Sequence, residues 1–179
     1  MHRHALDAFA ARLDISRYNE YIRDVKGKTQ GGRKGRGETT SPEELAFVDL
    51  LRTSDLLARG VVQALKPADL SPTQYNVLRI LRGSGEGLSC GEIAKRMITR
   101  DPDITRLLDR LEKRGLISRC REPKDRRMVL TRITPEGLKL LAQLDEPVRE
   151  THRRQLGHLG GETLRKLAAL LKAARRGEA

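Results

Sequence analysis

Aromatic residues and cysteine are scarce in this chain. Phe, Trp and Tyr together make up 3% of its 179 residues, and Trp is absent. Proteins that bind single-stranded nucleic acid stack bases on aromatic side chains, so a protein of that class is not expected. Two cysteines, Cys90 and Cys120, are too few for a disulfide framework and are typical of a reducing compartment. Cys90 falls near a predicted helix start, which leaves a redox-sensing role open, although inert structural cysteines are commoner.

Long hydrophobic runs are also missing. No stretch of 18 apolar residues is present, and the first residues lack the apolar segment of a secretory signal. We therefore expect a cytoplasmic protein that does not enter a membrane.

The motifs of common enzymes are absent as well. The sequence has no G-x-S-x-G or H-E-x-x-H pattern. Two of its four histidines, His152 and His158, are six residues apart, which places them on different faces of a helix. We expect no catalysis, no metal site and no cofactor.

Positive charge is abundant and unevenly distributed. The formal net charge is +12, and residues 95–127 hold twelve Lys or Arg against six Asp or Glu, which is half of that net charge. Such a concentration favours a polyanionic partner.

Two short helices are predicted just before and within this basic region. The first begins after Ser89, because Ser89 and Glu92 form a capping box. The second is expected to begin at Asp101-Pro102, an N-cap acceptor followed by proline, and to end at Gly115. Its apolar residues follow the i, i+3, i+4, i+7 spacing of one helix face: Ile104, Leu107, Leu108 and Leu111.

A β-hairpin should follow these helices. Residues 116–121 and 128–133 are β-prone runs, and between them lies a turn containing Pro123 and Asp125 among several cations. Two short helices and a basic hairpin, in this order, indicate a winged helix-turn-helix that binds duplex DNA.

Three segments of the sequence resemble the MarR (multiple-antibiotic-resistance regulator) family of bacterial transcription factors. They are the predicted recognition helix at 104–115, the hairpin tip Pro-Lys-Asp-Arg-Arg at 123–127 and the exit Leu-Thr-Arg-Ile-Thr-Pro-Glu-Gly at 130–137. The resemblance extends from about Ser41 to the C-terminus.

The resemblance implies a fold that is mostly α-helical with a small β-hairpin wing. A winged helix-turn-helix core at about 72–134 would be joined to dimerisation helices at about 42–66 and 135–175. Function would be sequence-specific binding of double-stranded DNA by a ligand-responsive repressor, acting as a homodimer on a pseudo-palindromic operator.

The resemblance also assigns DNA contacts residue by residue. Thr105 and Arg106 would face the major groove, and Arg127 would enter the minor groove while Asp125 orients it. Arg110 and Lys124 would contact phosphate. A solvated charged face is the alternative interpretation, but a guanidinium suits both a guanine edge and a narrow minor groove.

Two alternatives to a specific regulator remain open. The first is a winged helix that serves protein–protein contact, although positive charge on both the helix and the wing favours DNA. The second is a nonspecific architectural DNA-binding protein, which only the ratio of specific to nonspecific DNA affinity distinguishes from a specific regulator. In the family an anionic or phenolic effector commonly binds near the dimer helices, and by position Arg52, Arg59 and Tyr75 are candidates to contact it.

The remaining pattern predicts further helices. Capping boxes with a following proline occur at Ser41 and Ser71, and Thr134-Pro135 begins a later helix. Pro147 inside that helix predicts a kink or a one-turn interruption. Gly160-Gly161 is expected to separate it from the last helix.

Residues 1–40 form an N-terminal extension outside the resemblance. Residues 4–25 are compatible with a helix, and residues 26–40 read as a flexible basic linker. Either the extension is a basic arm that neutralises DNA phosphates, or its helix is exchanged between protomers to brace the dimer.

Overall fold

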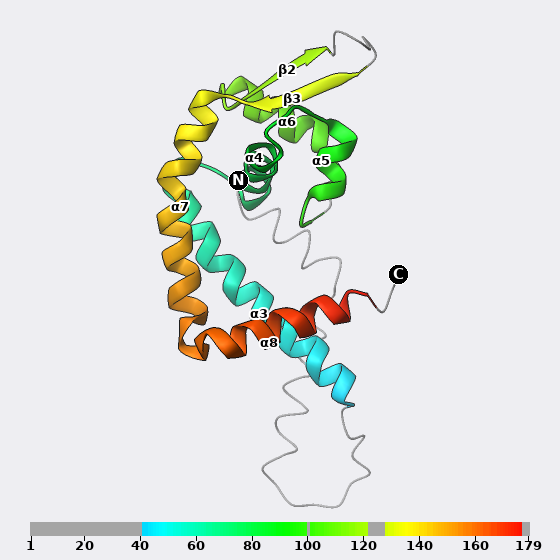
Figure 1. The fold of residues 1–179 in the computed structure, drawn as a ribbon, viewed down its shortest axis with the longest axis vertical. Helices are drawn as coiled ribbons and strands as arrows, with labels where there is room; N and C mark the ends of the chain where they lie inside the picture. The colour runs from blue at the N-terminus through cyan, green and yellow to red at the C-terminus, as the bar shows by residue number, and fades with distance from the viewer. Residues whose placement is uncertain (1–40, 100, 122–127, 177–179) are drawn as a thin grey trace, which may run out of the picture. The chain divides into compact units, whose positions relative to one another are not determined.

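The chain is built mainly of α-helices with one small antiparallel sheet, as the sequence predicts (Figure 1). The structure is a computed structural model that describes residues 41–99, 101–121 and 128–176. Two units divide the chain, Met1–Arg52 and Thr53–Ala179. The predicted extension at 1–40 and the predicted hairpin tip lie outside the described residues.

The described elements follow one another in a simple order. The helices are α3 (Pro42–Leu65), a 3₁₀ turn (Lys66–Ala68), α4 (Pro72–Ser84), α5 (Cys90–Arg96), α6 (Ile104–Lys113), α7 (Pro135–Leu156), a second 3₁₀ turn (Gly157–Leu159) and α8 (Gly160–Ala174). The strands are β1 (Leu88–Ser89), β2 (Ile117–Arg121) and β3 (Val129–Ile133).

The predicted capping boxes begin their helices. At α4 the Ser71 hydroxyl accepts from the Gln74 amide at 3.1 Å, and the Gln74 side chain accepts from the Ser71 amide at 2.9 Å. Reciprocal bonds of the same kind occur at the starts of α3 and α5. Each box satisfies backbone N–H groups that have no partner within the helix, so these starts are set locally.

Of the two outcomes predicted for Pro147, a kink or a one-turn interruption, the interruption does not occur, because α7 is continuous from Pro135 to Leu156. Proline removes one backbone donor, but Leu144 and Val148 on either side of it are buried in the core, and the Thr151 hydroxyl donates to the Pro147 carbonyl at 2.9 Å. Burial on both sides holds the helix together across the missing bond.

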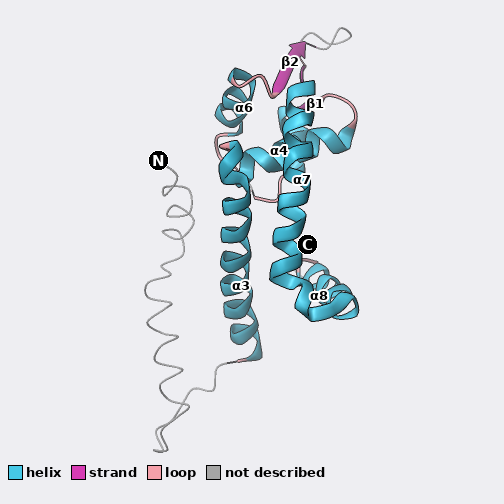
Figure 2. Cartoon of the chain, turned by 90° about the vertical axis from the view of Figure 1, so that its left-hand side faces the viewer, coloured by secondary structure: helices cyan, strands magenta, loops and turns pink. Residues whose placement is uncertain are grey.

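The break between α7 and α8 lies slightly earlier than predicted. The turn Gly157–Leu159 separates the two helices, and Gly160 and Gly161 are already the first residues of α8. Gly160 has φ of 72°, a conformation that glycine adopts without steric cost. Figure 2 shows the change of direction at this turn.

The sheet has the strand order β1-β3-β2, and all its pairs are antiparallel. The predicted hairpin forms with Ile117 opposite Ile133 and Arg119 opposite Thr131. Strand β1 was not predicted, because two residues are too short to show an alternating pattern. It pairs with β3 through Leu88 and Ser89.

The core belongs to the unit Thr53–Ala179. Helix α4 lies at its centre and packs against α5, α7 and β3. The largest completely buried side chains come from α3, α4, α5, α6, β2, β3 and α7: Leu65, Val77, Leu78, Leu81, Ile93, Leu108, Leu111, Ile117, Thr131 and Leu141. Helices α5 and α6 and the β2–β3 hairpin therefore pack on the same core.

Candidate nucleic-acid interface

Helix α6 has one buried face and one exposed, charged face. Leu107, Leu108 and Leu111 are buried, as predicted. Thr105, Arg106 and Arg110 point to solvent on the other side. Because the leucines pack into the core, the rotation of the helix about its axis is set, and the polar residues are presented outward.

The N-terminus of α6 differs from the sequence prediction. Asp103, and not Asp101, is the N-cap: its carboxylate accepts from the Arg106 amide at 3.3 Å. Asp101 instead accepts from the Asp103 amide at 2.9 Å, which turns the chain before the helix begins. Ile104 packs against the core, so the helix starts where its apolar stripe starts.

Arg106 is free to reach a ligand. Its side chain is 71% exposed, and its only described ion pair is a long contact of 3.7 Å with Asp103. Arg110 is also exposed and forms no ion pair with another described residue. Both guanidinium groups therefore remain mostly hydrated.

The C-terminus of α6 is closed by a glycine. Gly115 has φ of 68°, its amide donates to the Glu112 carbonyl at 2.8 Å, and the Leu116 amide donates to the Leu111 carbonyl at 3.0 Å. These two bonds form a Schellman motif, and the helix ends at Gly115 as the sequence predicts. Arg114 anchors this end by donating to the carbonyls of Asp69 at 2.6 Å and Ala68 at 2.9 Å.

The turn between α5 and α6 is held by α4. The side-chain oxygen of Asn76 accepts from the Ile98 amide at 3.0 Å. This bond attaches the start of the turn to the helix at the centre of the core.

An acidic pair on α6 binds an arginine on strand β2. The guanidinium of Arg119 donates from Nε to Glu112 at 2.9 Å, and from Nη2 to Glu112 and to Asp109 at 2.5 Å each. The Arg119 amide donates to Glu112 as well, at 3.2 Å. The hydrogen bond from Arg119 lowers the pKa of Glu112, and the same bond raises the pKa of Arg119. We call these three residues the α6–β2 clamp.

Sequence reasoning missed this clamp. Two acidic residues spaced i, i+3 on a basic helix, with an arginine shortly after the terminating glycine, are the signal that was available. Which side of β2 carries Arg119 depends on the strand register, and the register follows from the core.

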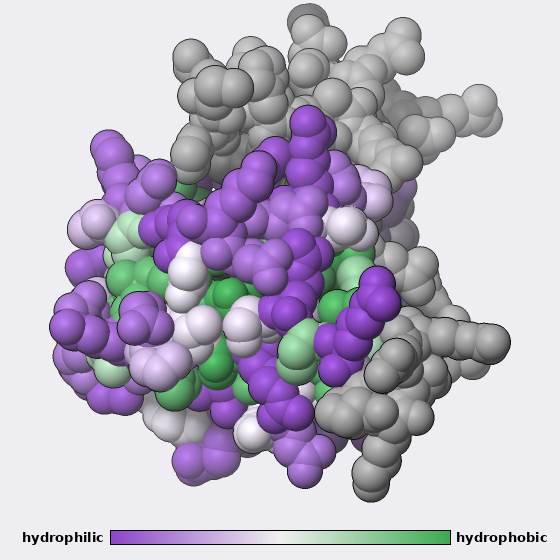
Figure 3. All heavy atoms as spheres, turned by 90° about the horizontal axis from the view of Figure 1, so that it is seen from above, coloured by the Kyte–Doolittle hydropathy of each residue, from purple (hydrophilic) through white to green (hydrophobic). Residues whose placement is uncertain are grey.

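The predicted wing residues Lys124, Asp125 and Arg127 lie outside the described residues. Figure 3 looks onto the end of the molecule that Figure 1 draws at the top. Hydrophilic side chains cover most of the described surface there, and the apolar areas between them are small. A hydrated, polar surface suits contact with phosphate and base edges.

The three predicted effector residues differ in burial and in their partners. Arg52 is exposed and belongs to the first unit, and Arg59 is exposed and paired with Asp55 on its own helix at 2.7 Å. Tyr75 is almost completely buried, and the guanidinium of Arg79 lies 5.8 Å from the centre of its ring. Burial raises the pKa of Tyr75.

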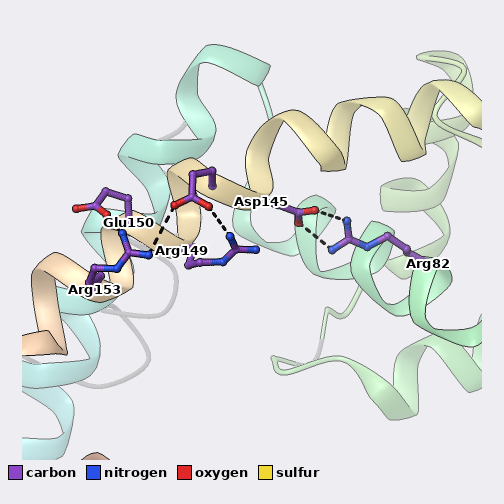
Figure 4. Close-up of polar contacts among 6 residues, drawn as sticks. Arg82, Asp145, Arg149, Glu150 and Arg153 are labelled. Atoms are coloured by element: carbon purple, nitrogen blue, oxygen red, sulfur yellow. Dashed lines mark hydrogen bonds and ion pairs between the residues drawn. The ribbon is translucent and has the colours of Figure 1, made fainter. Parts of the chain in front are cut away.

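A second charged contact joins α4 to α7 (Figure 4). Arg82 donates to both carboxylate oxygens of Asp145, at 2.8 and 2.9 Å. This hydrogen bonding lowers the pKa of Asp145. The neighbouring pairs in the same view, among Glu146, Arg149, Glu150 and Arg153, lie within α7 itself.

Within residues 41–99, 101–121 and 128–176, no group of three His, Cys, Asp or Glu side chains is placed to hold a metal ion. None of the helices in these ranges is both long enough and apolar enough to cross a membrane. Cys90 is half-buried and Cys120 is exposed, and both are free thiols.

Comparison with known proteins matches this geometry to one family. The sequence model of the MarR family matches residues 70–129. A MarR transcription factor from Planctomyces limnophilus is 43% identical, with 77% of this chain and 99% of that chain covered and a TM-score of 0.58. The HTH-type transcriptional repressor IacR from Pseudomonas putida is 29% identical over 130 residues, which are 73% of this chain and 77% of the repressor.

A solved complex supplies a further comparison. It is a cysteine-to-serine variant of MarR from E. coli bound to operator DNA. The two chains are 26% identical, the match covers 74% of this chain and 95% of that chain, and the TM-score is 0.66.

Proposed function

The chain belongs to the MarR family of transcriptional regulators, and from that premise we propose that it represses transcription by binding, as a homodimer, to a pseudo-palindromic operator in double-stranded DNA. A regulator of this family is not an enzyme. In this proposal residues 72–134 are the DNA-binding core, and the helices within 42–66 and 135–175 join the two protomers.

The exposed face of α6 is the observation that supports this function most directly. Thr105, Arg106 and Arg110 share the face opposite the buried leucines, and Arg106 is only weakly paired. A helix that enters the major groove needs such a face, because base edges are read by side chains that are not already bound. We assign Arg106 and Thr105 to base edges and Arg110 to phosphate.

The wing completes the proposed interface. Arg127 would enter the minor groove with Asp125 holding its guanidinium, and Lys124 would contact phosphate. The described strands β2 and β3 supply the hairpin that carries these residues. The operator-bound variant of MarR from E. coli, with a similar fold, supports duplex DNA as the partner.

A homodimer follows from the size of the groove contact. One recognition helix reads only a few base pairs, so two are needed, spaced about 34 Å apart on the duplex. Large apolar side chains remain exposed on helices outside the winged core, among them Leu56 on α3 and Leu170 on α8. A partner subunit packed against these helices would remove such side chains from water.

An anionic or phenolic effector is part of the proposal. Arg52 and Arg59 would supply cations and Tyr75 a ring and hydroxyl. The guanidinium of Arg79, which lies over the ring of Tyr75 near the start of α4, supports an anionic ligand there.

Selection of a preferred duplex from a random-sequence library tests the function. We expect the protein to enrich a pseudo-palindrome. On that duplex, Arg106→Ala should lose about 1–3 kcal/mol of binding and relax the preference at one position of each half-site. Arg110→Ala should weaken all duplexes alike and reduce the slope of log K against log salt by about 2, because each of the two subunits loses one phosphate contact. Enrichment of no sequence would point to an architectural protein instead.

A further inference from the structure

We propose that Arg119 is a positioning residue that fixes the wing hairpin to the recognition helix, so that the major-groove and minor-groove contacts are presented at a set spacing. This inference rests on the proposed function. It assigns no DNA contact to Arg119 itself, which acts through Glu112 and Asp109 of the α6–β2 clamp.

The clamp attaches the strand at two points. Glu112 accepts from the backbone amide of Arg119 at 3.2 Å and from its guanidinium at 2.9 and 2.5 Å. A single bond would allow the strand to rotate about it. Bonds to both backbone and side chain restrict the position and the rotation of β2 relative to α6, and planar guanidinium geometry makes the restriction directional.

The attachment lies at the free edge of the sheet. With the order β1-β3-β2, strand β2 pairs with β3 on one side only. Arg119 is the central residue of β2 and lies opposite Thr131, which is buried and also pairs with Leu88 of β1. One row of residues therefore connects all three strands to α6.

The clamp is also the outermost link between α6 and the described hairpin. The base of the hairpin is held by Leu116 and Ile117, which are buried in the core. Beyond Arg119, no hydrogen bond or ion pair joins α6 to residues 120–121 or 128–133. Met128 and Val129 at the outer end of the hairpin are exposed. A hairpin held only at its base would swing, and its outer end would move most.

If Asp109 and Glu112 affected DNA binding only through their negative charge, their removal would have the opposite effect to the one that the clamp predicts. Asp109 and Glu112 lie on a helix that faces a polyanion, and their side chains are 42% and 37% exposed, against 26% for Arg119. If their only effect were repulsion of phosphate, removal of a carboxylate would strengthen DNA binding. If Glu112 holds the hairpin through Arg119, removal of its carboxylate should weaken binding.

The experiment compares Glu112→Ala with Glu146→Ala. Alanine favours helix, so both variants should fold, and both raise the net charge by one. Glu146 is exposed, lies outside the proposed DNA-binding core and, among the described residues, pairs with Arg149 and Arg153 of its own helix. Because α7 is one of the proposed dimerisation helices, size-exclusion chromatography first checks that Glu146→Ala has the same mass as the unmodified protein, which makes it a matched control. Glu112→Gln is a third variant, because its amide oxygen can still accept from Arg119.

Hydrogen exchange of the DNA-free protein is measured first. We expect faster amide exchange in residues 117–121 and 129–133 of Glu112→Ala, with α4 and α7 unchanged and with an intermediate effect in Glu112→Gln. Unchanged exchange in both strands overturns the proposal, whatever the DNA result. Faster exchange together with failure of the unmodified protein to select any duplex would leave the clamp established and refute the proposed function.

DNA footprinting on the selected duplex tests the consequence. We expect Glu112→Ala to bind on the order of tenfold more weakly than Glu146→Ala, to lose protection from hydroxyl radicals in the minor groove, and to keep protection of guanine N7 in the major groove. Arg119→Lys should also bind weakly, since an ammonium cannot bridge both carboxylates in the plane of a fork. Binding by Glu112→Ala as tight as the control, with the same footprint, overturns the proposal.

Discussion

The ion pair between Arg82 and Asp145 is a sensitive point at the scale of single residues. Two parallel hydrogen bonds join the side chains, and these bonds lower the pKa of Asp145. The carboxyl group therefore binds its proton less readily in the folded protein than in the unfolded chain. Its contribution to stability is complete above the ordinary carboxyl pKa of about 4, begins to decrease below that pH, and is lost once the pH falls through the lowered pKa of the folded protein.

We expect Asp145→Asn to destabilise the protein at pH 7 by about 1 kcal/mol, a value kept low because a third of each side chain is exposed and solvent screens the pair. At pH 3, below the ordinary carboxyl pKa, the difference from the unmodified protein should be clearly smaller than at pH 7. Thermal unfolding at both pH values measures this. Asp55→Asn, which breaks an exposed pair on α3, is the control and should change stability little at either pH. An equal loss at both pH values would show that the charge of Asp145 is not responsible.

At the scale of elements, two backbone segments approach closely at the start of α7. Thr134 caps the helix by accepting from the Gly137 amide at 3.1 Å, and its hydroxyl donates to the Gly115 carbonyl at 2.7 Å. The backbones approach so closely that a Cβ on Gly137 would lie 2.3 Å from the Leu116 carbonyl oxygen. This junction joins the end of α6, the hairpin and α7, and it explains why glycine follows Thr134-Pro135-Glu136.

We expect Gly137→Ala to destabilise the protein by about 1–3 kcal/mol, since the obstructing atom is backbone and cannot rotate away. Gly83→Ala is the matched control. Gly83 also lies in a helix, α4, but a Cβ there would meet no atom within 4 Å, so alanine should stabilise by roughly 0.5–1 kcal/mol. Urea unfolding of both variants gives the comparison. Stabilisation by both substitutions would mean that α7 begins farther from Leu116 than described.

At the scale of the whole molecule, exposed leucines on α3 and α8 support assembly of two chains. Leu56 is 60% exposed and Leu170 is 68% exposed. Such residues in a monomer would present apolar surface to water, whereas a dimer would bury them.

We expect Leu170→Glu to shift the protein from dimer to monomer at micromolar concentration, because each subunit would place a charge in the apolar contact. Ala168→Glu adds the same charge to α8 two residues earlier, which is about 200° around the helix. It should leave the dimer intact. Size-exclusion chromatography with light scattering reads the mass of each variant. If the unmodified protein is itself a monomer, the proposed dimer is wrong.

Features whose bonds lie within a few residues were predictable from the sequence. Ser71 and Ser89 cap their helices as expected, because the donor and acceptor are three residues apart and need no distant partner. The apolar stripe of α6 was predictable for a similar reason. Apolar residues three and four positions apart lie on one face of a helix, and that face is the one that is buried. The exposed positions of Thr105 and Arg106 follow from that stripe.

Competition between equally plausible local signals could not be decided from the sequence. Asp101 and Asp103 can both accept a backbone N–H, and Asp103 caps α6 because Ile104 packs against the core. Pro147 favours a break, but the buried neighbours Leu144 and Val148 keep α7 continuous. In both cases tertiary packing outweighs a local preference.

The amino-acid sequence by itself determined the caps of α3, α4, α5 and α7, the inward and outward faces of the helices, the basic character of the recognition region and the family. Only the tertiary structure decided how the pieces are joined: β1 against β3, Arg82 with Asp145, and Arg119 with Glu112 and Asp109. The physical reason is the separation in sequence between the interacting residues. A helix cap or an amphipathic stripe involves residues only a few positions apart. A contact between residues far apart in the chain depends on strand register and on the core that brings the two segments together.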